Sequence, residues 1–94
     1  MKVRNIQHRA LRRFYEEDET KGLPADALAK LADMLAFVDN MKTVEDLKAL
    51  KLWKAHTLTG NRKGTWALHV TRNWRLTFRI EDNEVCDLNF EDYH

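Results

Sequence analysis

The first half of the chain carries hydrophobic residues at helical spacing. Residues 8–17 repeat apolar positions three to four residues apart, which is typical of one helix face. The residues on that face are Leu11, Phe14 and Tyr15. A second helix is predicted from Pro24 to Asn40, because proline suits a first helical turn, where its missing N–H has no partner. The side chains that this helix would bury are Leu28, Leu31, Leu35 and Val38. Thr43, followed by Asp46, resembles a capping box and predicts a short third helix.

The second half of the chain changes to a period of two. Alternation of this kind predicts half-buried antiparallel strands with one face toward the core. The residues predicted to face the core are Trp66, Leu68, Val70, Trp74, Leu76, Phe78, Ile80, Cys86, Leu88 and Phe90. The links 71–73 and 82–83 are short enough for hairpins. Two further short strands are predicted, at residues 2–6 and around 54–58.

These elements predict an α+β fold in which two or three N-terminal helices pack on one face of a twisted antiparallel sheet. The 94 residues are expected to form a single domain, 1–94. If Trp74 and Leu76 face the helices, then Arg75 and Arg79 face away from them, and His69 lies on the same outer face of its own strand. This outer face would therefore display groups that suit phosphate.

Composition narrows the class of protein. Hydrophobic residues make up 44% and charged residues 33%, the balance of a soluble globular protein, and the chain lacks an apolar run long enough for a membrane span. A basic N-terminus without an apolar region behind it does not resemble a secretion signal. Cys86 as the one cysteine excludes an internal disulfide and favours the cytoplasm. Neither a metal nor another cofactor is expected, because Cys86 and the four histidines show no ligand spacing.

Positive charge is concentrated in two blocks, although the formal net charge is only +1. Residues 1–13 and residues 48–79 contain lysines and arginines and no acidic residue. Such blocks in a nearly neutral chain indicate a local patch for a polyanion. The candidates for contact with such a polyanion are Lys54, Arg62, Lys63, Arg72 and Arg79.

Several segments together resemble the HigB-type toxins of the RelE/ParE superfamily. The segment at 54–66 (KAHTLTGNRKGTW) is similar to their K-L-H-x-L-x-G-x-R-x-G-x-W run, and the segment at 73–79 (NWRLTFR) to their N-W-R-I-T-F strand. The ending at 92–94 (DYH) matches theirs. Residues 29–39 resemble their second helix, and residues 22–24 the turn before it. The resemblance spans essentially the whole chain.

This resemblance implies a RelE/ParE-like fold and an endoribonuclease that cleaves translated mRNA in the A site of the 70S ribosome. It also implies a helix-turn-helix, HigA-like antitoxin that neutralises the toxin and links it to operator DNA. The family's functional positions fall on His56, Arg75, Asp92, Tyr93 and His94. This chain departs from the family at Thr59, where the family often has a lysine that would contact phosphate.

The chemistry of RNA cleavage suits these five residue types. Attack by the 2′-OH on phosphorus requires a base, an acid for the leaving 5′-oxygen and a cation beside the phosphorane. We expect Arg75 to bind the scissile phosphate, Tyr93 to position the nucleotide, and His94 with Asp92 to share the proton transfers. His56 would assist at the phosphate or at the 2′-OH. Which of His94, Asp92 and His56 is the base stays open.

Two other functions compete with this hypothesis. The ParE branch of the same superfamily inhibits DNA gyrase as a binding module without catalysis, and fold alone does not separate the two. A non-catalytic nucleic-acid-binding domain would also account for the basic blocks. Neither alternative explains why Asp92, Tyr93 and His94 are clustered, so the nuclease is the favoured function.

Overall fold

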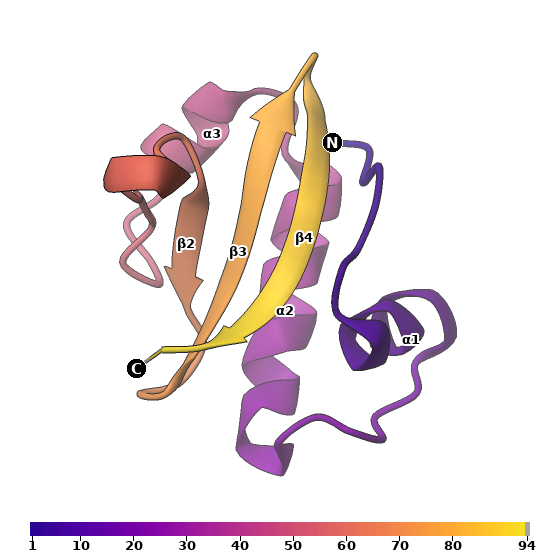
Figure 1. Cartoon of the computed structure of the whole chain (residues 1–94). Helices are drawn as coiled ribbons and strands as arrows, with labels where there is room; N and C mark the ends of the chain where they lie inside the picture. The colour runs from indigo at the N-terminus through magenta and orange to yellow at the C-terminus, as the bar shows by residue number, and fades with distance from the viewer. Residues whose placement is uncertain (94) are drawn as a thin grey trace.

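A computed structural model describes residues 1–93 and shows helices packed on one face of an antiparallel sheet (Figure 1). The helices are α1 (Arg9–Glu17), α2 (Leu28–Asn40) and α3 (Val44–Lys48), with short 3-10 turns η1 (Ala25–Ala27) and η2 (Gly60–Arg62). The strands are β1 (His56–Thr57), β2 (Trp66–His69), β3 (Trp74–Glu81) and β4 (Glu84–Asp92). The predicted α+β class, with helices on one face of the sheet, is confirmed.

The helices form where the apolar spacing predicts them. The helix predicted from Pro24 begins with the turn η1, and α2 follows it. The fully or nearly fully buried residues of α2 are Leu31, Met34, Leu35 and Val38, so Met34 joins the predicted set while Leu28 is half-buried. The capping box at the start of α3 is confirmed, because Thr43 accepts from the helix backbone and Asp46 accepts from the backbone N–H of Thr43.

The sheet has the order β1-β2-β3-β4, with all neighbours antiparallel. Both predicted hairpin links exist, and the tighter one places Asp82 and Asn83 at positive φ, which these two residue types tolerate better than most. The strand expected around 54–58 is shorter than predicted and covers only His56 and Thr57. Of the residues predicted to face the core from β2 and β3, Leu68, Leu76 and Phe78 are fully buried. Three others are only partly buried and pack against the core: Trp66, Trp74 and Ile80.

The predicted alternation is wrong at the start of β4. The register between β3 and β4 shifts between Thr77 and Arg79, and Asp87 has a φ of 55°. This β-bulge inserts one extra residue, so the side chains before it change faces. Val85 is therefore part of the hydrophobic core, whereas Cys86 pairs with Arg79 and lies outside that cluster, although it is buried.

The predicted strand at residues 2–6 is present as two isolated parallel bridges beside β4. Val3 pairs with Val85 and Ile6 pairs with Leu88. Arg4 and Gln7 donate their backbone N–H groups to β4 carbonyls at 2.6 and 2.7 Å. The N-terminal segment thus covers the edge of β4 before the chain enters α1 (Figure 1).

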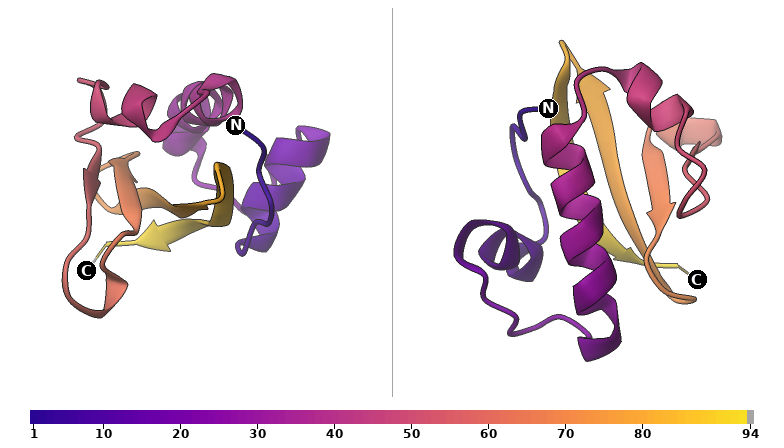
Figure 2. Two further views of the ribbon diagram at one scale, coloured as in Figure 1. Left: turned by 90° about the horizontal axis from the view of Figure 1, so that it is seen from above. Right: turned by 180° about the vertical axis from the view of Figure 1, so that it is seen from behind.

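The hydrophobic core lies between the sheet and α2, so the opposite face of the sheet is turned away from the core. Viewed from above, the loop that contains η2 projects on the side of the sheet away from α2 (Figure 2, left). Leu31, Val38, Leu68 and Phe78 are among the fully buried residues between the two layers. Within residues 1–93, no helix is long and apolar enough to cross a bilayer.

Candidate active site

A cavity of about 230 Å³ opens on the outer face of the sheet, opposite the helices. Its lining residues are His56, Leu58, Arg62, Ala67, Arg75, Thr77, Glu91, Asp92 and Tyr93. Strand register explains the grouping, because His56 pairs with Ala67, Ala67 with Thr77, and Arg75 with Glu91. The four predicted catalytic residues within the described part of the chain therefore converge on one cavity.

Arg75 is the most buried of the four predicted catalytic residues that line the cavity. It faces away from the helices as predicted, but only 8% of it is exposed, so the expectation of a freely displayed arginine is wrong. Its Nη1 donates to the carbonyls of Thr71 and Trp74 at 2.8 and 3.0 Å, and the guanidinium lies 4.2 Å from the centre of the Tyr93 ring. The β2–β3 turn and the Tyr93 ring thus fix and cover the guanidinium.

The Nε atom of Arg75 is buried and has no hydrogen-bond partner within residues 1–93. A buried N–H without an acceptor raises the free energy of the folded state. Phosphate oxygens are strong acceptors for guanidinium donors. Arg75 also lines the cavity, so an anion bound there would meet a strong guanidinium donor.

His56 lies at the edge of the sheet, exposed to solvent, and its hydrogen bond fixes a tautomer. Its Nδ1 lies 2.8 Å from the carbonyl oxygen of Lys54. A carbonyl only accepts, so Nδ1 carries the proton and Nε2 of the neutral ring is the acceptor. His56 can therefore take a proton through Nε2.

His69 lies beside His56 and opposite Arg75 but is not a lining residue of the cavity. The two imidazole rings meet edge to face, with centroids 5.8 Å apart. Burial, with help from the charge of Arg75, lowers the pKa of His69. A half-buried ring with a lowered pKa that does not line the cavity fits a structural role better than a catalytic one.

Asp92 and Tyr93 reach the cavity because β4 continues to its end beside the β2–β3 turn. Asp92 pairs with Trp74, and the backbone N–H of Tyr93 donates to the carbonyl of Asn73 at 2.6 Å. Tyr93 is 62% exposed, so its ring covers Arg75 from the solvent side. The predicted residue His94 lies outside the described residues.

Glu91 is a residue of the cavity that the sequence reasoning missed. Its carboxylate accepts from both terminal nitrogens of Arg62, at 3.0 and 2.6 Å, and from the hydroxyl of Thr77. The bonds from Arg62 lower the pKa of Glu91, although partial burial opposes them. The alternation of β4 could have revealed Glu91, because Leu88 and Phe90 face the core and so place Glu91 on the outer face, opposite Arg75.

The five predicted RNA contacts do not all lie at the cavity. Arg62 lines it, whereas Lys54, Lys63 and Arg72 are exposed on the loops around it. Arg79 is exposed farther along β3 and forms ion pairs with Glu81 and Asp87. Arg62 and Arg79 therefore both have acidic partners, Arg62 through Glu91 and Arg79 through Glu81 and Asp87.

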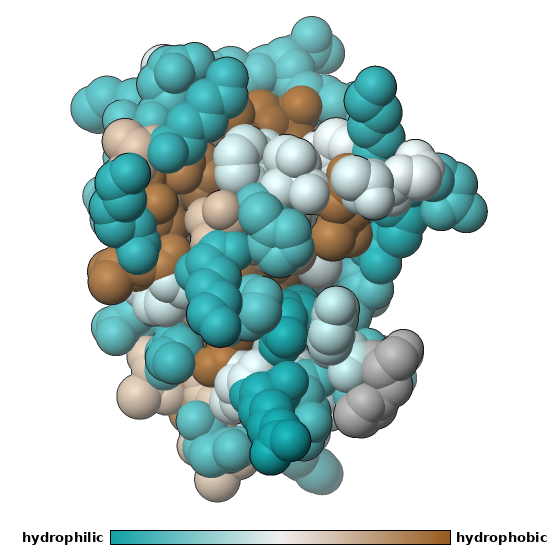
Figure 3. Space-filling model, turned by 90° about the vertical axis from the view of Figure 1, so that its left-hand side faces the viewer, coloured by the Kyte–Doolittle hydropathy of each residue, from teal (hydrophilic) through white to brown (hydrophobic). Residues whose placement is uncertain are grey.

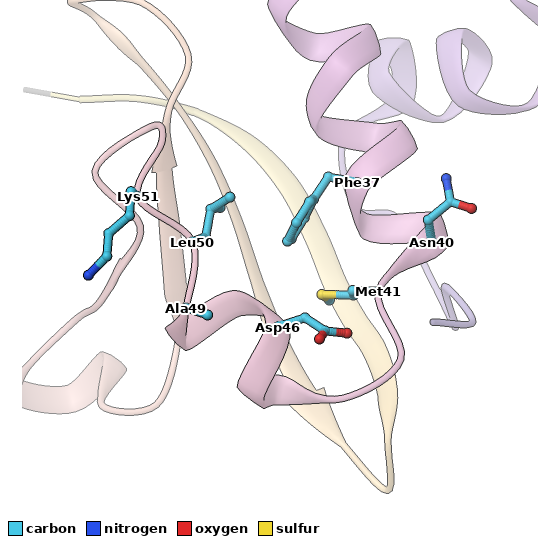
Figure 4. A pocket seen from close by; sticks show the side chains of 7 residues that line it. All are labelled: Phe37, Asn40, Met41, Asp46, Ala49, Leu50 and Lys51. Carbon is cyan, nitrogen blue, oxygen red and sulfur yellow. The ribbon is translucent and has the colours of Figure 1, made fainter.

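A larger groove of about 440 Å³ lies between α2 and α3, where Phe37 and Leu50 point toward each other and Lys51 points away (Figure 4). Viewed from the left-hand side of Figure 1, hydrophobic surface is exposed in places between hydrophilic side chains (Figure 3). The predicted site residues within 1–93 lie elsewhere, so we treat the smaller cavity as the candidate site. Within the same residues, no group of three histidine, cysteine or acidic side chains is arranged to hold a metal ion.

Comparison with known proteins agrees with this arrangement. Residues 4–94 match the family model of HigB-like toxins, described as RelE-like toxins of type II toxin–antitoxin systems. Endoribonuclease HigB of Proteus vulgaris is 33% identical over 92 residues, which cover 98% of this chain and 99% of the relative.

Solved structures share the fold at low sequence identity. A YoeB/ParE toxin from Agrobacterium tumefaciens superposes with a TM-score of 0.60 at 19% identity, covering 100% of this chain and 99% of that one. A chain of the YoeB–YefM complex from Staphylococcus aureus gives 0.56 at 16% identity, with coverage of 100% and 99%. The family model and the Proteus relative each span nearly the whole chain. This protein belongs to the HigB-like family of RelE-like toxins, the toxin components of type II toxin–antitoxin systems.

Proposed function

We propose that this protein is an endoribonuclease that cleaves translated mRNA in the A site of the ribosome and thereby inhibits growth. The observation that carries the proposal is the convergence of His56, Arg75, Asp92 and Tyr93 on one cavity of the outer sheet face. A relative that is 33% identical to this chain is named an endoribonuclease. Because the residues of the cavity supply the groups that RNA cleavage needs, the activity has a structural basis in this chain.

The proposed reaction begins with the 2′-OH attacking the adjacent phosphorus while a base removes its proton. Arg75 stabilises the charge that develops on the phosphorane oxygens, because its guanidinium is held in place before the substrate arrives. The P–O5′ bond then breaks, and an acid protonates the leaving oxygen. Side chains supply every proton transfer in this scheme.

Two of the candidate bases differ in what supports them. His56 has an Nε2 acceptor that is set by its bond to Lys54. Asp92 lines the cavity beside Tyr93, and His94 follows directly in the sequence. We propose that His56, Asp92 and His94 share the base and acid roles, and that Tyr93 stacks on or hydrogen-bonds to the nucleotide at the cut.

The partners in this proposal follow from the reaction and from the family. A type II toxin has an antitoxin partner, and we propose that this one is a helix-turn-helix, HigA-like protein through which the complex reaches operator DNA. The 70S ribosome and its mRNA are the proposed targets, which places the protein in the cytoplasm. The exposed cations Lys54, Lys63 and Arg72 would contact the RNA backbone.

Primer extension on a defined mRNA tests the proposal. In a purified translation system, the wild-type protein should produce cuts at A-site codons, and the same RNA without ribosomes should remain intact. The variants His94→Ala and Asp92→Asn should each slow cleavage by about 100-fold or more. Intact mRNA at protein concentrations that still arrest growth would contradict the proposal, and loss of gyrase supercoiling activity under those conditions would then identify the binding-module function.

A further inference from the structure

The carboxylate of Glu91 lines the same cavity as two arginines that suit an anion, Arg62 and Arg75. Glu91 lies directly opposite Arg75 in the register of β3 and β4, and both residues line the same cavity. Its side chain is 26% exposed. A negative charge in this position repels phosphate, so its presence calls for a role that outweighs the repulsion.

Glu91 is poorly suited to the role of a general base. A base needs a free lone pair and a pKa near the working pH. The carboxylate oxygens of Glu91 instead accept from Arg62 and Thr77, and the bonds from Arg62 lower its pKa. The chemistry of Glu91 is therefore that of a permanent anchor for a cation.

The cation that Glu91 binds belongs to the loop between β1 and β2. Arg62 ends the turn η2, and the bidentate pair joins it to β4, 29 residues later in the chain. Gly60 and Gly64, on either side of Arg62, both have positive φ and open space around them. A tie to β4 restricts a loop of this kind far more than its own backbone does.

We propose that Glu91 is a positioning residue for RNA cleavage, which holds Arg62 at the mouth of the cavity so that Arg62 and Arg75 act on the same phosphate group. This inference rests on the function proposed above. A guanidinium has five N–H donors, and the pair with Glu91 uses two of them, so the other donors of Arg62 are available to the RNA. Thr77 of β3, which is 3% exposed, donates its hydroxyl to the carboxylate of Glu91 and helps to fix it.

The substitution Glu91→Gln separates positioning from electrostatics, because the two predict opposite results. Removing a negative charge beside an RNA site strengthens binding by simple electrostatics and would not slow cleavage. Loss of positioning leaves RNA binding at least as tight and lowers the rate of the chemical step, since a small displacement of a catalytic cation is costly. We expect the maximal single-turnover rate constant to fall about 10-fold or more, while the toxin concentration that gives half of the maximal rate stays the same or decreases.

The experiment measures single-turnover cleavage by the full-length protein on 70S ribosomes programmed with a defined mRNA. The variants are Glu91→Gln, Arg62→Ala and the double variant, and the matched control is Glu84→Gln, which breaks another Arg–Glu pair on the same strand, the one with Arg4 at 3.0 Å. The double variant should cleave no more slowly than Arg62→Ala alone, because one unit is disrupted in both. Additive losses, or a Glu91→Gln protein as fast as the control, would overturn the proposal.

Hydrogen exchange of the isolated protein keeps this inference distinct from the function it rests on. Amides of residues 58–65 should exchange faster in Glu91→Gln than in wild type, while the control Glu84→Gln leaves them unchanged. If the wild-type protein fails to cut mRNA, the proposed function is wrong, and the exchange data still test whether Glu91 holds the loop. Unchanged exchange in a folded Glu91→Gln protein would refute the positioning role.

Discussion

Arg75 and Glu91 stand opposite each other on neighbouring strands, yet they bind different partners. Arg75 donates to the carbonyls of its own turn, whereas Glu91 accepts from Arg62 and Thr77. Since Glu91 does not neutralise Arg75 through these bonds, the charge of Arg75 is retained for a ligand. At the scale of single residues, the cavity therefore holds two cations in place: Arg75 through the carbonyls of the β2–β3 turn, and Arg62 through the carboxylate of Glu91.

His8 provides a prediction about stability at the residue scale. Its Nδ1 accepts from the backbone N–H of Leu11 at 3.1 Å and so caps α1, which an imidazolium cannot do. Burial lowers the pKa of His8 below its ordinary value of 6.5. The neutral form is therefore favoured in the folded state, and the stabilisation is complete above about pH 6.5 and is lost as the pH falls through the lower, folded-state pKa.

The free energy of urea unfolding, measured at about pH 7.5 and about pH 5, checks this prediction for His8. The wild-type protein should lose more stability between the two conditions than His8→Asn, since asparagine caps helices and does not titrate in this range. The comparison cancels the contribution of other titrating groups such as His69. An equal loss in both proteins would show that the cap does not respond to pH.

Which side chains share the outer face could be predicted from alternation, but how they bond could not. The period of two is enough to place Arg75 and His69 on the face away from the helices, where the strand register pairs them. The same reasoning, applied to Leu88 and Phe90, would have found Glu91. The burial of Arg75 was not predictable, because it depends on the carbonyls of the β2–β3 turn and on the Tyr93 ring, which alternation does not describe.

At the scale of elements, β4 shows why a strict pattern fails locally. Asp87 adopts a φ of 55° in the bulge and receives a hydrogen bond from the side chain of Asn5 at 3.0 Å. Aspartate tolerates this conformation better than most residues, but nothing in its neighbours distinguishes it from an ordinary outward position. The bulge lets Val85, Leu88 and Phe90 all face the core.

The capping box of α3 yields a prediction at the element scale. Thr43→Ala removes the side-chain acceptor at 3.3 Å from the Glu45 N–H and should lower the free energy of unfolding by about 1 kcal/mol. Urea denaturation measures the change, and the slope against urea concentration should stay constant because the surface exposed on unfolding is the same. Thr20→Ala, at an exposed turn position, is the matched control. Equal stability of the two variants would mean that the box does not support α3.

At the scale of the whole molecule, acidic residues compensate part of the charge in each of the two basic blocks. In the first block, Lys2 and Arg4 pair with Glu84, and Arg4 also lies 3.8 Å from Glu81, so acids of the β3–β4 hairpin compensate their charge. In the second block, Arg62 and Arg79 also have acidic partners, whereas Lys54, Lys63 and Arg72 are exposed on loops next in sequence to residues near the cavity. The chain order of charges could not reveal which cations are compensated, because this depends on which segments lie side by side in the fold, such as the N-terminal segment beside β4.

The central claim is that the outer-face cavity around Arg75 is the place where RNA is cut. The most direct test is single-turnover cleavage of a defined mRNA on 70S ribosomes by wild type, Arg75→Ala and Arg75→Lys, with Lys30→Ala at an exposed position of α2 as the control. Both Arg75 variants should have the circular dichroism spectrum of the folded wild type and should cleave at least about 100-fold more slowly. The lysine variant should also be slow, because lysine keeps the positive charge but lacks the fork of guanidinium donors. A folded Arg75 variant that cleaves at the wild-type rate would contradict the account.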